Sequence, residues 1–496
     1  MAQKWGSLPP ELNEGYAIMN PLFLKDFYKV GHIDQYPEGT ELIFSNFTPR
    51  KSRMPGINHA VFFGLKYFID KYLNAFEFYS AIGSSHLHNY YSLIMRKTLG
   101  TDKSFDHIEK LCNLGHLPLA VYALPEGTVV PCGVPALVMF NTHPEFFWLP
   151  NMLETILSCT LWGACTSATI AREYRWLLDE FAVKTCDNNA HVDYQAHDFS
   201  MRGMFGLEAA IISGMAHLQY FKGTDSIPAL IARNQHYHTP FQIASIPATE
   251  HSVMSAGGKD SEFDTFKRLI CDVYPSGFIS IVSDTWNLWT VITDFLPRLK
   301  DRIMARDGRV VIRPDSGDPV EIICGLDSFS DFYRECIGFN DYVCKGVIEC
   351  LWNIFGGTIN SEGYKVLDPH IGCIYSDSIT LDRARDILER LERKGFAASN
   401  IVFGIGSYTY QYNTRDTLGW AMKSTYCERH GVGYPITKDP VTDDGTKKSH
   451  SGILKVVKVA GAHGSTFHVE QNCSWDEFHQ PDNELKLVYK DGTCYI

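Results

Sequence analysis

The sequence predicts an α/β protein whose second half forms a β/α barrel. From about Val192 onward, short apolar strands end in polar or glycine residues and are followed by helices. Seven such units follow one another, and this pattern is typical of a barrel with its active face at the carboxyl ends of the strands. A doubly wound open sheet is the structural alternative, because the spacing of the units does not distinguish the two.

The clearest unit is residues 309–319. Val310, Val311 and Ile312 form a continuous β-branched run, which suits a strand covered on both faces, and the run stops in a Pro-Asp-Ser-Gly cluster. Taken alone, this is explained by an ordinary turn in which Asp315 caps the next helix. The recurrence of the same pattern favours a shared functional edge.

The remaining six units lie on both sides of this one. After the first strand, Leu207, Ile211, Met215 and Leu218 recur at helical spacing, and a charged amphipathic helix is predicted at Leu381–Arg393 after the sixth. The six strands are predicted at 192–196, 221–225, 243–247, 278–282, 370–374 and 400–403.

The first 187 residues mix helices and strands and predict an α+β region. Strands are expected at 42–50, 119–122 and 136–138, and a helix at 148–161. No internal repeat, low-complexity tract or charge block marks a flexible linker. At 496 residues and 45% hydrophobic content, the chain is long enough to bury a sizeable core and to form two domains.

Charge and composition exclude several classes of protein. A formal net charge of -12 leaves no global field that attracts phosphate backbones, so nucleic-acid binding is not expected as the main role. The first ten residues lack the apolar core of a secretory signal, and no later run is long enough to span a bilayer, which predicts a cytoplasmic protein with no membrane partner. Fourteen cysteines without a CxxC pair predict reduced thiols rather than a zinc site or disulfides.

Acidic residues at the predicted strand ends suggest a metal-dependent phosphate chemistry. Asp284, Asp315 and Asp377 supply the hard oxygen ligands that Mg²⁺ prefers, as expected for Mg²⁺ bound to a diphosphate. His251, which follows Glu250, is the histidine whose position suggests a nucleophile or an acid/base group. Taken one at a time, each of these aspartates is also explained as the capping residue of the helix that follows it.

Basic and glycine residues on the same edge suit an anionic substrate. Arg202, Arg313 and Arg415 offer planar donors for phosphate oxygens or an amide carbonyl, although a surface salt bridge is the default for any one arginine. Gly406 and Ser407 end the seventh strand and can present backbone N–H groups to a phosphate. A tight turn explains this short GxG segment equally well.

Several motifs together resemble the nicotinamide phosphoribosyltransferase family. Their order is that of the family, and they cover nearly the whole chain. The segment 404–416 (GIGSYTYQYNTRD) resembles the bacterial and phage branch. The other motifs are 26–32 (DFYKVGH), 197–203 (HDFSMRG), 221–225 (FKGTD), 247–252 (PATEHS), 312–317 (IRPDSG) and 438–440 (KDP).

The resemblance implies a type II phosphoribosyltransferase fold, with an irregular β/α barrel and an α+β domain built from the N- and C-terminal parts. The implied domains are 1–190, 191–407 for the barrel with the active site, and 408–496 packing with the first. The implied reaction joins nicotinamide to 5-phosphoribosyl 1-diphosphate, giving nicotinamide mononucleotide and diphosphate in NAD salvage. It also implies Mg²⁺, ATP hydrolysis coupled through a phosphohistidine, and a homodimer with shared sites.

The resemblance also implies roles for individual residues. His251 would carry the phosphoryl group, Asp315 and Asp284 would act in catalysis and at the metal, and Tyr28 of the partner subunit would face Phe199 across the ring. Substrate binding would fall to Phe199, Asp225, Arg313, Tyr28, Arg202, Ser280 and Asp26. Phosphate binding would fall to Arg50, Gly406, Ser407, Arg415, Lys423, Lys438, Lys447 and Asp377.

Within this resemblance, Asp225 would accept a hydrogen bond from the carboxamide NH2 and Arg313 would face the carboxamide oxygen. Asp26, Arg50, Arg415 and Lys423 would reach across from the partner. The sequence departs from the family pattern at two positions in segments that would bind phosphate groups. Ser407 stands where many relatives carry glycine, and Thr446 precedes Lys447.

Two rival hypotheses are a nicotinate phosphoribosyltransferase and a catalytically silent binding relative. Asp225 argues against the first, because a carboxylate repels the negative charge of nicotinate. Retention of His251 and Asp315 argues against the second. The sequence therefore favours the nicotinamide enzyme.

Overall fold

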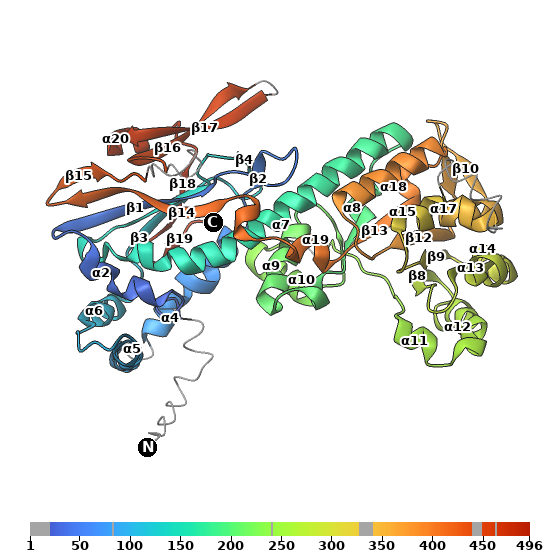
Figure 1. Ribbon diagram of the computed structural model, residues 1–496, viewed down its shortest axis with the longest axis horizontal. Helices are drawn as coiled ribbons and strands as arrows, with labels where there is room; N and C mark the ends of the chain where they lie inside the picture. The colour runs from blue at the N-terminus through green and yellow to red at the C-terminus, as the bar shows by residue number, and fades with distance from the viewer. Residues whose placement is uncertain (1–19, 82–83, 240–241, 327–340, 439–448, 462–463) are drawn as a thin grey trace, which may run out of the picture. The chain divides into compact units, whose positions relative to one another are not determined.

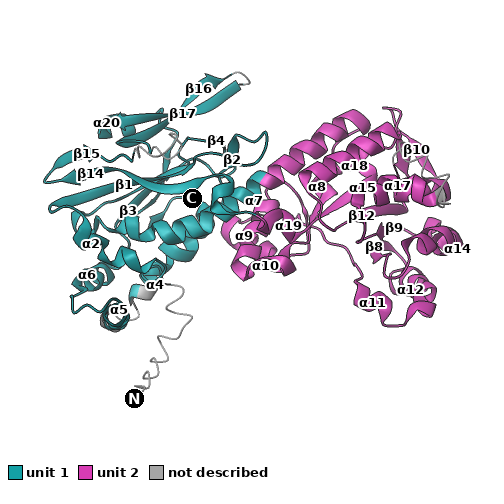
Figure 2. Cartoon of the chain, in the orientation of Figure 1, with its two compact units in different colours: residues 1–169, 413–496 teal, residues 170–412 magenta. Residues whose placement is uncertain are grey.

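The computed structural model describes residues 20–81, 84–239, 242–326, 341–438, 449–461 and 464–496 (Figure 1). The chain forms two compact units (Figure 2). Unit 1 combines Met1–Thr169 with Asn413–Ile496, and unit 2 is Ile170–Tyr412. Both ends of the chain therefore belong to one unit, and the predicted domain limits after residues 190 and 407 stay predictions.

Unit 1 is built on a seven-stranded antiparallel sheet with the order β15-β14-β1-β5-β3-β18-β19. The longest pairing runs between the N-terminal β1 and the C-terminal β14, so neither end of the chain completes this sheet alone. The strands are β1 Thr40–Pro49, β3 Leu119–Ala123, β5 Leu137–Asn141, β14 Trp420–Arg429, β15 Val432–Pro435, β18 Lys486–Lys490 and β19 Thr493–Cys494.

Aromatic side chains pack between the N-terminal and C-terminal parts of unit 1. Phe47 of β1 stacks on Trp420 of β14 with ring centroids 4.4 Å apart, and both side chains are fully buried. Helices cover one face of the sheet, as Figure 1 shows. They are η2 Phe27–Gly31, α2 His32–Gln35, α3 Leu65–Phe68, η3 Ile69–Leu73, α4 Ala75–Ala81, α5 Ser84–Leu99, α6 Asp106–Leu114 and the start of α7 Leu149–Thr185.

Helix α7 is longer than the segment 148–161 that the sequence predicts. The prediction stops where Thr and Ser residues interrupt the apolar pattern. In the structure, Thr166 and Thr169 donate to the carbonyls of the residues four positions earlier, so their hydroxyls are satisfied inside the helix. Unit 1 also contains the hairpins β2 His59–Val61 with β4 Val129–Pro131 and β16 Ile453–Gly461 with β17 Gly464–Cys473, the turn η4 Pro144–Phe146, η11 Arg415–Thr417, and α20 Trp475–Phe478.

Unit 2 contains a six-stranded parallel sheet with the order β7-β6-β13-β12-β9-β8. In this sheet β6 pairs with β7, β8 with β9, β9 with β12 and β12 with β13, and the last strand, β13, pairs with the first, β6. Strands β7 and β8 are its two edges. The strands are β6 Ala196–Asp198, β7 Gly223–Thr224, β8 Gly277–Val282, β9 Gly308–Arg313, β12 Ile371–Tyr375 and β13 Ile401–Ile405.

The segment 244–248 joins the two edges of this sheet. Ala244 forms a parallel bridge with Gly223 of β7, and Ala248 forms one with Ser280 of β8. The strand order is therefore circular, which excludes the doubly wound open sheet and confirms the predicted irregular barrel.

Two predicted strands are wrong in detail. Residues 192–195 form the helical turn α8 Val192–Gln195, and β6 begins only at Ala196, because the pattern of so few residues does not distinguish strand from helix. The segment 243–247 is not a strand, because it makes one single bridge, at Ala244, and the second bridge is at the adjoining Ala248. Pro247 lacks the N–H that a regular ladder needs there.

Helices surround the barrel strands in unit 2 (Figure 1). Helix α18 Leu381–Arg393 has the predicted bounds. The others are α9 Leu207–His217, α10 Ile227–Tyr237, α11 His251–Ser255, α12 Glu262–Arg268, α13 Leu288–Thr290, α14 Leu296–Met304, α15 Pro319–Cys324, α17 Asp341–Phe355 and α19 Ser407–Gln411, with the short turns η5 Met201–Gly203, η6 Lys259–Ser261, η7 Leu269–Val273, η8 Val291–Phe295 and η10 Ala398–Asn400 and the hairpin β10 Gly357–Ile359 with β11 Lys365–Leu367.

In the described part of the chain, no helix has the length and apolarity needed to cross a membrane. The described cysteines are free thiols.

Candidate active site

Phe199 and Asp225 follow two neighbouring strands of the barrel, β6 and β7. The Phe199 N–H donates to the Ile405 carbonyl at 3.0 Å, and the Asp225 N–H donates to the Asp198 carbonyl at 3.0 Å. Both backbone positions are therefore held by the sheet. A Cβ on Gly404 would lie 2.6 Å from the Phe199 ring, so the absence of a side chain at residue 404 makes room for the ring.

The Asp225 carboxylate is held by two side chains. His197 Nε2 lies 2.9 Å from Asp225 Oδ1, and Ser245 Oγ donates to the same oxygen at 2.6 Å. Partial burial raises the pKa of Asp225, but these hydrogen bonds and the charge of Arg313 outweigh it, so the pKa is lower than usual. Asp225 is therefore an ionised carboxylate at neutral pH.

His251 faces two carboxylates at the ends of β8 and β9. Its Nε2 lies 4.0 Å from Asp284 Oδ1 and 3.8 Å from Asp315 Oδ2, and its Nδ1 lies 3.1 Å from Thr285 Oγ1. The imidazole is half exposed, at 51%. The structure thus brings together the three residues predicted to be catalytic.

The two carboxylates are arranged to receive a cation. Asp284 Oδ2 accepts hydrogen bonds from the Asp315 N–H at 2.8 Å and from Ser316 Oγ at 2.5 Å, whereas its buried Oδ1 has no hydrogen-bond partner among the described residues. Ser376 Oγ donates to Asp315 Oδ1 at 2.6 Å, which leaves Oδ2 facing His251. Hard oxygen donors of this kind fit a divalent cation such as Mg²⁺.

Two carboxylates alone do not complete the coordination of a metal ion. Among the described residues there is no group of three or more His, Cys, Asp or Glu side chains that could hold one. The pair therefore fits a cation that arrives with further oxygen ligands, such as those of a diphosphate.

Arg313 links the carboxylate pair to Asp225. Burial lowers the pKa of Arg313, and the positive charge of Arg202 lowers it further. The negative charges of Asp315, Asp225 and Asp284 raise it. These four charged side chains therefore lie near the Arg313 guanidinium. One Arg313 amino group donates to the Thr249 carbonyl, and the buried Nε has no hydrogen-bond partner among the described residues. The guanidinium is thus a donor with capacity left for a ligand.

The predicted phosphate-binding residues of unit 2 lie at the ends of β12 and β13. Gly406 precedes α19, which begins at Ser407, and a Cβ on Gly203 would meet Ser407 Oγ at 2.0 Å. The 197–203 motif and the GxG segment are therefore in close contact. Asp377 follows β12 and is exposed.

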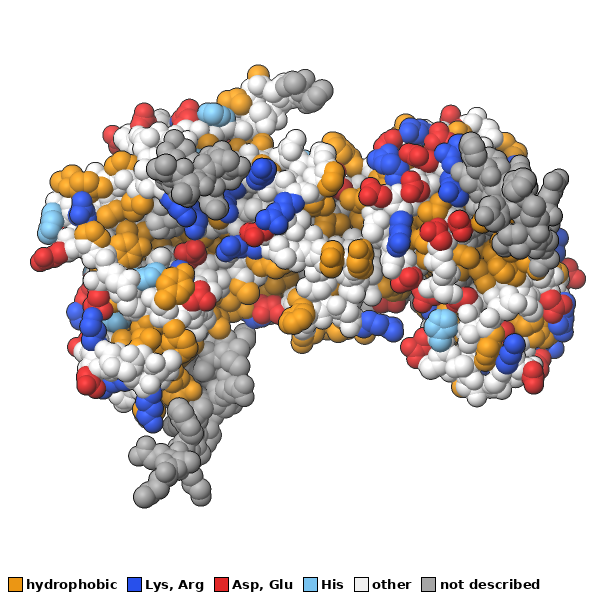
Figure 3. Space-filling model, in the orientation of Figure 1, with side chains coloured by type: hydrophobic (Ala, Val, Ile, Leu, Met, Phe, Trp, Pro, Cys, Tyr) orange, Lys and Arg blue, Asp and Glu red, His pale blue; other side chains and the backbone are white. Residues whose placement is uncertain are grey.

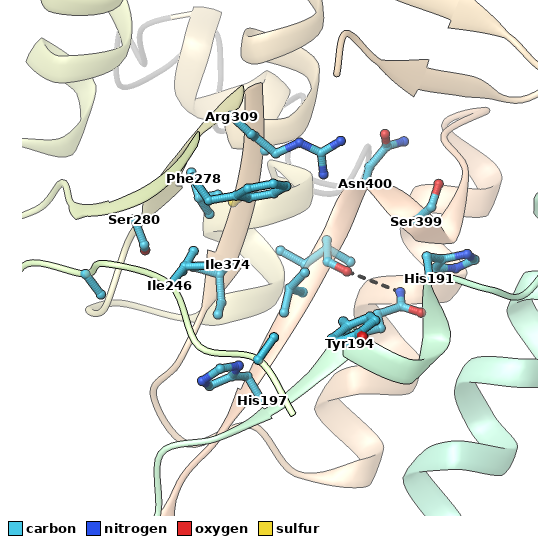
Figure 4. A pocket seen from close by; sticks show the side chains of 18 of the residues that line it. His191, Tyr194, His197, Ile246, Phe278, Ser280, Arg309, Ile374, Ser399 and Asn400 are labelled. Atoms are coloured by element: carbon cyan, nitrogen blue, oxygen red, sulfur yellow. Dashed lines mark hydrogen bonds between the residues drawn. The ribbon is translucent and has the colours of Figure 1, made fainter. Parts of the chain in front are cut away.

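A cavity of about 570 Å³ runs from this edge into the barrel. Its lining includes Phe199, Asp225 and Ser280, and the buried Ser280 Oγ has no hydrogen-bond partner among the described residues. Figure 4 shows His197 at one end and Arg309 at the other. The volume is within the range typical of small-molecule sites, and it exceeds that of a single pyridine ring several times.

In unit 1, the predicted basic residues gather around Lys423 of β14. Partial desolvation lowers the pKa of Lys423, and the charges of Arg50, Arg415 and Lys438 lower it further, while Glu154 opposes them. Lys and Arg side chains gather on the face of unit 1 that Figure 3 shows. Lys447 lies outside the described residues.

Tyr28 and Asp26 also belong to unit 1. The Tyr28 side chain is 64% exposed and its ring lies edge-on to His32, with centroids 5.1 Å apart. Asp26 Oδ2 accepts a hydrogen bond from Thr155 Oγ1 at 2.9 Å, which ties the segment before η2 to α7. An exposed aromatic ring in this setting is available to a ligand.

Four side chains at the site were missed by the sequence reasoning. His197 and Ser245 hold Asp225, Ser376 holds Asp315, and Thr285 contacts His251. His197, Thr285 and Ser376 follow predicted strand ends, which is the one signal that could have found them, whereas Ser245 lies in the middle of the strand predicted at 243–247. Hydroxyl groups occur at most turns, so that signal is weak.

The structure has the type II phosphoribosyltransferase fold, as predicted. It resembles human nicotinic acid phosphoribosyltransferase with a TM-score of 0.55 at 16% identity, covering 95% of this chain and 90% of that one. It also resembles nicotinate-nucleotide pyrophosphorylase from Pyrococcus furiosus with a TM-score of 0.53 at 14% identity, covering 100% and 94%.

Two family models match the sequence. The nicotinate phosphoribosyltransferase (NAPRTase) family matches residues 194–491, and the nicotinamide phosphoribosyltransferase N-terminal domain matches residues 20–121. A nicotinamide phosphoribosyltransferase of Acinetobacter baylyi is 47% identical over 96% of this chain and 95% of its own, and one of Mycoplasma pneumoniae is 35% identical over 90% and 96%. The chain belongs to the nicotinamide phosphoribosyltransferases of the NAPRTase family.

Proposed function

We propose that the protein transfers the 5-phosphoribosyl group from 5-phosphoribosyl 1-diphosphate to nicotinamide, giving nicotinamide mononucleotide and diphosphate in NAD salvage. The observation that carries this proposal is the ionised Asp225 beside Phe199 at the barrel cavity. A carboxylate accepts a hydrogen bond from the carboxamide NH2, whereas it repels the carboxylate of nicotinate. The names of the relatives support the same substrate.

The base is held by one aromatic ring and two polar groups. Phe199 stacks on the pyridine ring, Asp225 accepts from the carboxamide NH2, and Arg313 donates to the carboxamide oxygen. The Nε of Arg313 and the Oγ of Ser280, which have no hydrogen-bond partner among the described residues, supply further polar contacts at the ring edge. These contacts aim the ring nitrogen at the sugar.

The transfer itself needs positioning and charge stabilisation. The ring nitrogen forms a bond to the anomeric carbon while the bond to the diphosphate breaks, through an oxocarbenium-like state. Arg202 and the backbone of Gly406 and Ser407 would hold the ribose phosphate, and Asp377 lies at the same edge of the barrel. Mg²⁺, held by Asp284 and Asp315, would offset the charge that develops on the diphosphate.

ATP hydrolysis is coupled to this transfer through His251. The imidazole takes the γ-phosphoryl group of ATP, ADP leaves, and the phosphohistidine is later hydrolysed. The position of His251 beside Asp284 and Asp315 supports this role, because a phosphoryl group there would share a cation with the diphosphate.

The active unit is a homodimer with shared sites. Tyr28 of the partner would cover the other face of the ring that Phe199 stacks on. Asp26, Arg50, Arg415 and Lys423 of the partner would reach the ribose and phosphate groups, and Lys438 and Lys447 would hold diphosphate or the ATP phosphates. The exposed Tyr28 ring and the basic group around Lys423 support this arrangement.

One assay tests the proposal. Nicotinamide and nicotinate are compared as acceptors for 5-phosphoribosyl 1-diphosphate, each with and without ATP. At about 4 Å and an effective dielectric constant near 20, two like charges repel by ~4 kcal/mol, or roughly a thousandfold. Allowing for screening and for Arg313, we expect nicotinamide to be preferred by at least about two decades in kcat/KM. Equal use of both bases would overturn the assignment.

A further inference from the structure

Two hydrogen bonds converge on one oxygen of Asp225. His197 Nε2, from β6, and Ser245 Oγ, from the bridging segment 244–248, both meet Oδ1, at 2.9 Å and 2.6 Å. Among the described residues, no group donates a hydrogen bond to Oδ2. The carboxylate is therefore held by one oxygen and open at the other.

The barrel makes room for this arrangement. A Cβ on Gly223 would lie 2.6 Å from His197 Nδ1, so His197 occupies the space that a side chain at residue 223 would take. The His197 ring also packs against Phe199, with centroids 4.7 Å apart. His197 thus contacts both residues that we assign to the base.

All these residues line the same cavity. His197, Phe199, Asp225 and Ser245 are part of its wall, and Figure 4 shows His197 at the end opposite Arg309. Ser245 lies in the irregular segment 244–248, which meets β7 at the edge that does not pair with β6. Its hydroxyl donates to Asp225 from that side. Two elements that pair with β7 from opposite sides therefore hold its terminal carboxylate.

We infer that His197 and Ser245 are positioning residues that leave Asp225 a single free oxygen for the carboxamide NH2, and that they set the preference of the site for an amide over a carboxylate base. This inference rests on the proposed function and deepens it. A carboxylate fixed at one oxygen cannot turn away from the base. The two donors also keep it ionised, which maintains its repulsion of nicotinate.

Ser245→Ala and His197→Phe each remove one donor. We expect each to lower kcat/KM for nicotinamide by about tenfold, which is typical for a lost hydrogen bond to a charged group. The loss is expected in the KM for nicotinamide, with the KM for 5-phosphoribosyl 1-diphosphate unchanged. The kcat/KM for nicotinate is expected to stay the same or to rise, so the ratio of the two bases falls by about tenfold or more.

A conservative variant and a matched control separate positioning from general damage. His197→Gln keeps an N–H near the position of Nε2, and we expect it to retain the wild-type ratio within about threefold. Ser399→Ala makes the same chemical change as Ser245→Ala elsewhere in the cavity wall, and we expect it to leave the ratio unchanged. The thermal midpoint of each variant shows whether it is folded.

A double-mutant cycle gives the decisive readout. In an Asp225→Ser background the two donors have no carboxylate to hold, so Ser245→Ala is expected to cause no further change in the ratio. The inference would be overturned if both single variants are folded and keep the wild-type ratio of kcat/KM for nicotinamide to that for nicotinate. It would also be overturned if Ser245→Ala lowers this ratio equally in the presence and absence of Asp225. If His197→Phe does not fold, Ser245→Ala alone decides. A wild-type protein that uses neither base would instead refute the proposed function.

Discussion

Two groups of predicted site residues carry opposite charge, an acidic pair in unit 2 and a basic group in unit 1. In unit 2, Asp284 and Asp315 face His251 within 4.0 Å, and Asp284 Oδ1 has no hydrogen-bond partner among the described residues. In unit 1, Arg50, Arg415 and Lys438 surround Lys423 closely enough to lower its pKa. Neither group of charges is neutralised within itself.

The two groups therefore suit ligands of opposite charge. Carboxylates with open oxygen atoms attract a cation, while clustered lysine and arginine side chains attract phosphate oxygens. Like charges held together repel, so each group lowers stability without its ligand and gains when the ligand binds. The following predictions test whether the two groups serve one site.

Mixing two inactive variants gives the largest expected effect. Tyr28→Ala lies in unit 1 and Asp225→Ala in unit 2, and each homodimer is expected to be inactive. In a heterodimer one of the two shared sites contains neither substitution, so we expect activity to return to about half that of the wild-type dimer. The measurement is the transfer activity of the heterodimer isolated after dissociation and re-association of a purified mixture. No recovery in isolated heterodimers would show that the two residues act in the same subunit.

Removal of one carboxylate tests the acidic group. Asp315→Asn takes away the negative charge that faces His251 but keeps the shape of the side chain, and we expect kcat to fall by about a hundredfold. Asp318→Asn is the matched control, because Asp318 only caps α15 through the N–H groups of Val320 and Glu321, and asparagine caps equally well. Similar losses in both variants would argue against a special role for Asp315.

Lys423→Met tests the basic group. We expect the KM for 5-phosphoribosyl 1-diphosphate to rise by roughly tenfold, because one charge-assisted contact is lost. The pKa of Lys423 is lowered in the folded protein, so its charged form opposes folding at neutral pH. Removing the charge is therefore expected to leave the thermal midpoint of the ligand-free protein unchanged or higher.

Lys458→Met provides the control for that variant. Lys458 lies on β16, and its Nζ pairs with Glu484 Oε2 at 3.0 Å. It is not part of the basic group around Lys423. Its loss is expected to leave the KM unchanged. A drop in the thermal midpoint of Lys423→Met larger than that of Lys458→Met would contradict the repulsion argument.

The smallest expected effect concerns His251. His251→Ala is expected to abolish the gain that ATP gives while the transfer stays detectable, since chemistry at the sugar does not itself require the imidazole. The comparison is the initial rate with and without ATP for both proteins, together with acid-labile phosphate on the protein. ATP stimulation equal to that of wild type would show that His251 does not carry the phosphoryl group.

Much of the barrel could be predicted from local sequence. Val310 to Ile312 form a continuous apolar run and helix α18 has a strong helical periodicity, and both lie where the sequence predicts them. The strand predicted at 192–196 is wrong because the pattern of only five residues fits a helical turn as well as a strand. The strand predicted at 243–247 is wrong because this stretch only bridges the edges of β7 and β8, at Ala244 and at the adjoining Ala248, and Pro247 lacks an N–H for a ladder.

The site shows the same division. The residue types at the strand ends, Asp225, Asp284, Asp315 and His251, are visible in the sequence because parallel strands bring their carboxyl ends to one edge. Which oxygen of Asp225 is held, and by which donors, depends on Ser245 and His197, which lie 20 and 28 positions away in the chain. Only the tertiary structure decides such contacts, because hydrogen bonds are directional and act over about 3 Å, while the sequence pattern reports no distance between elements.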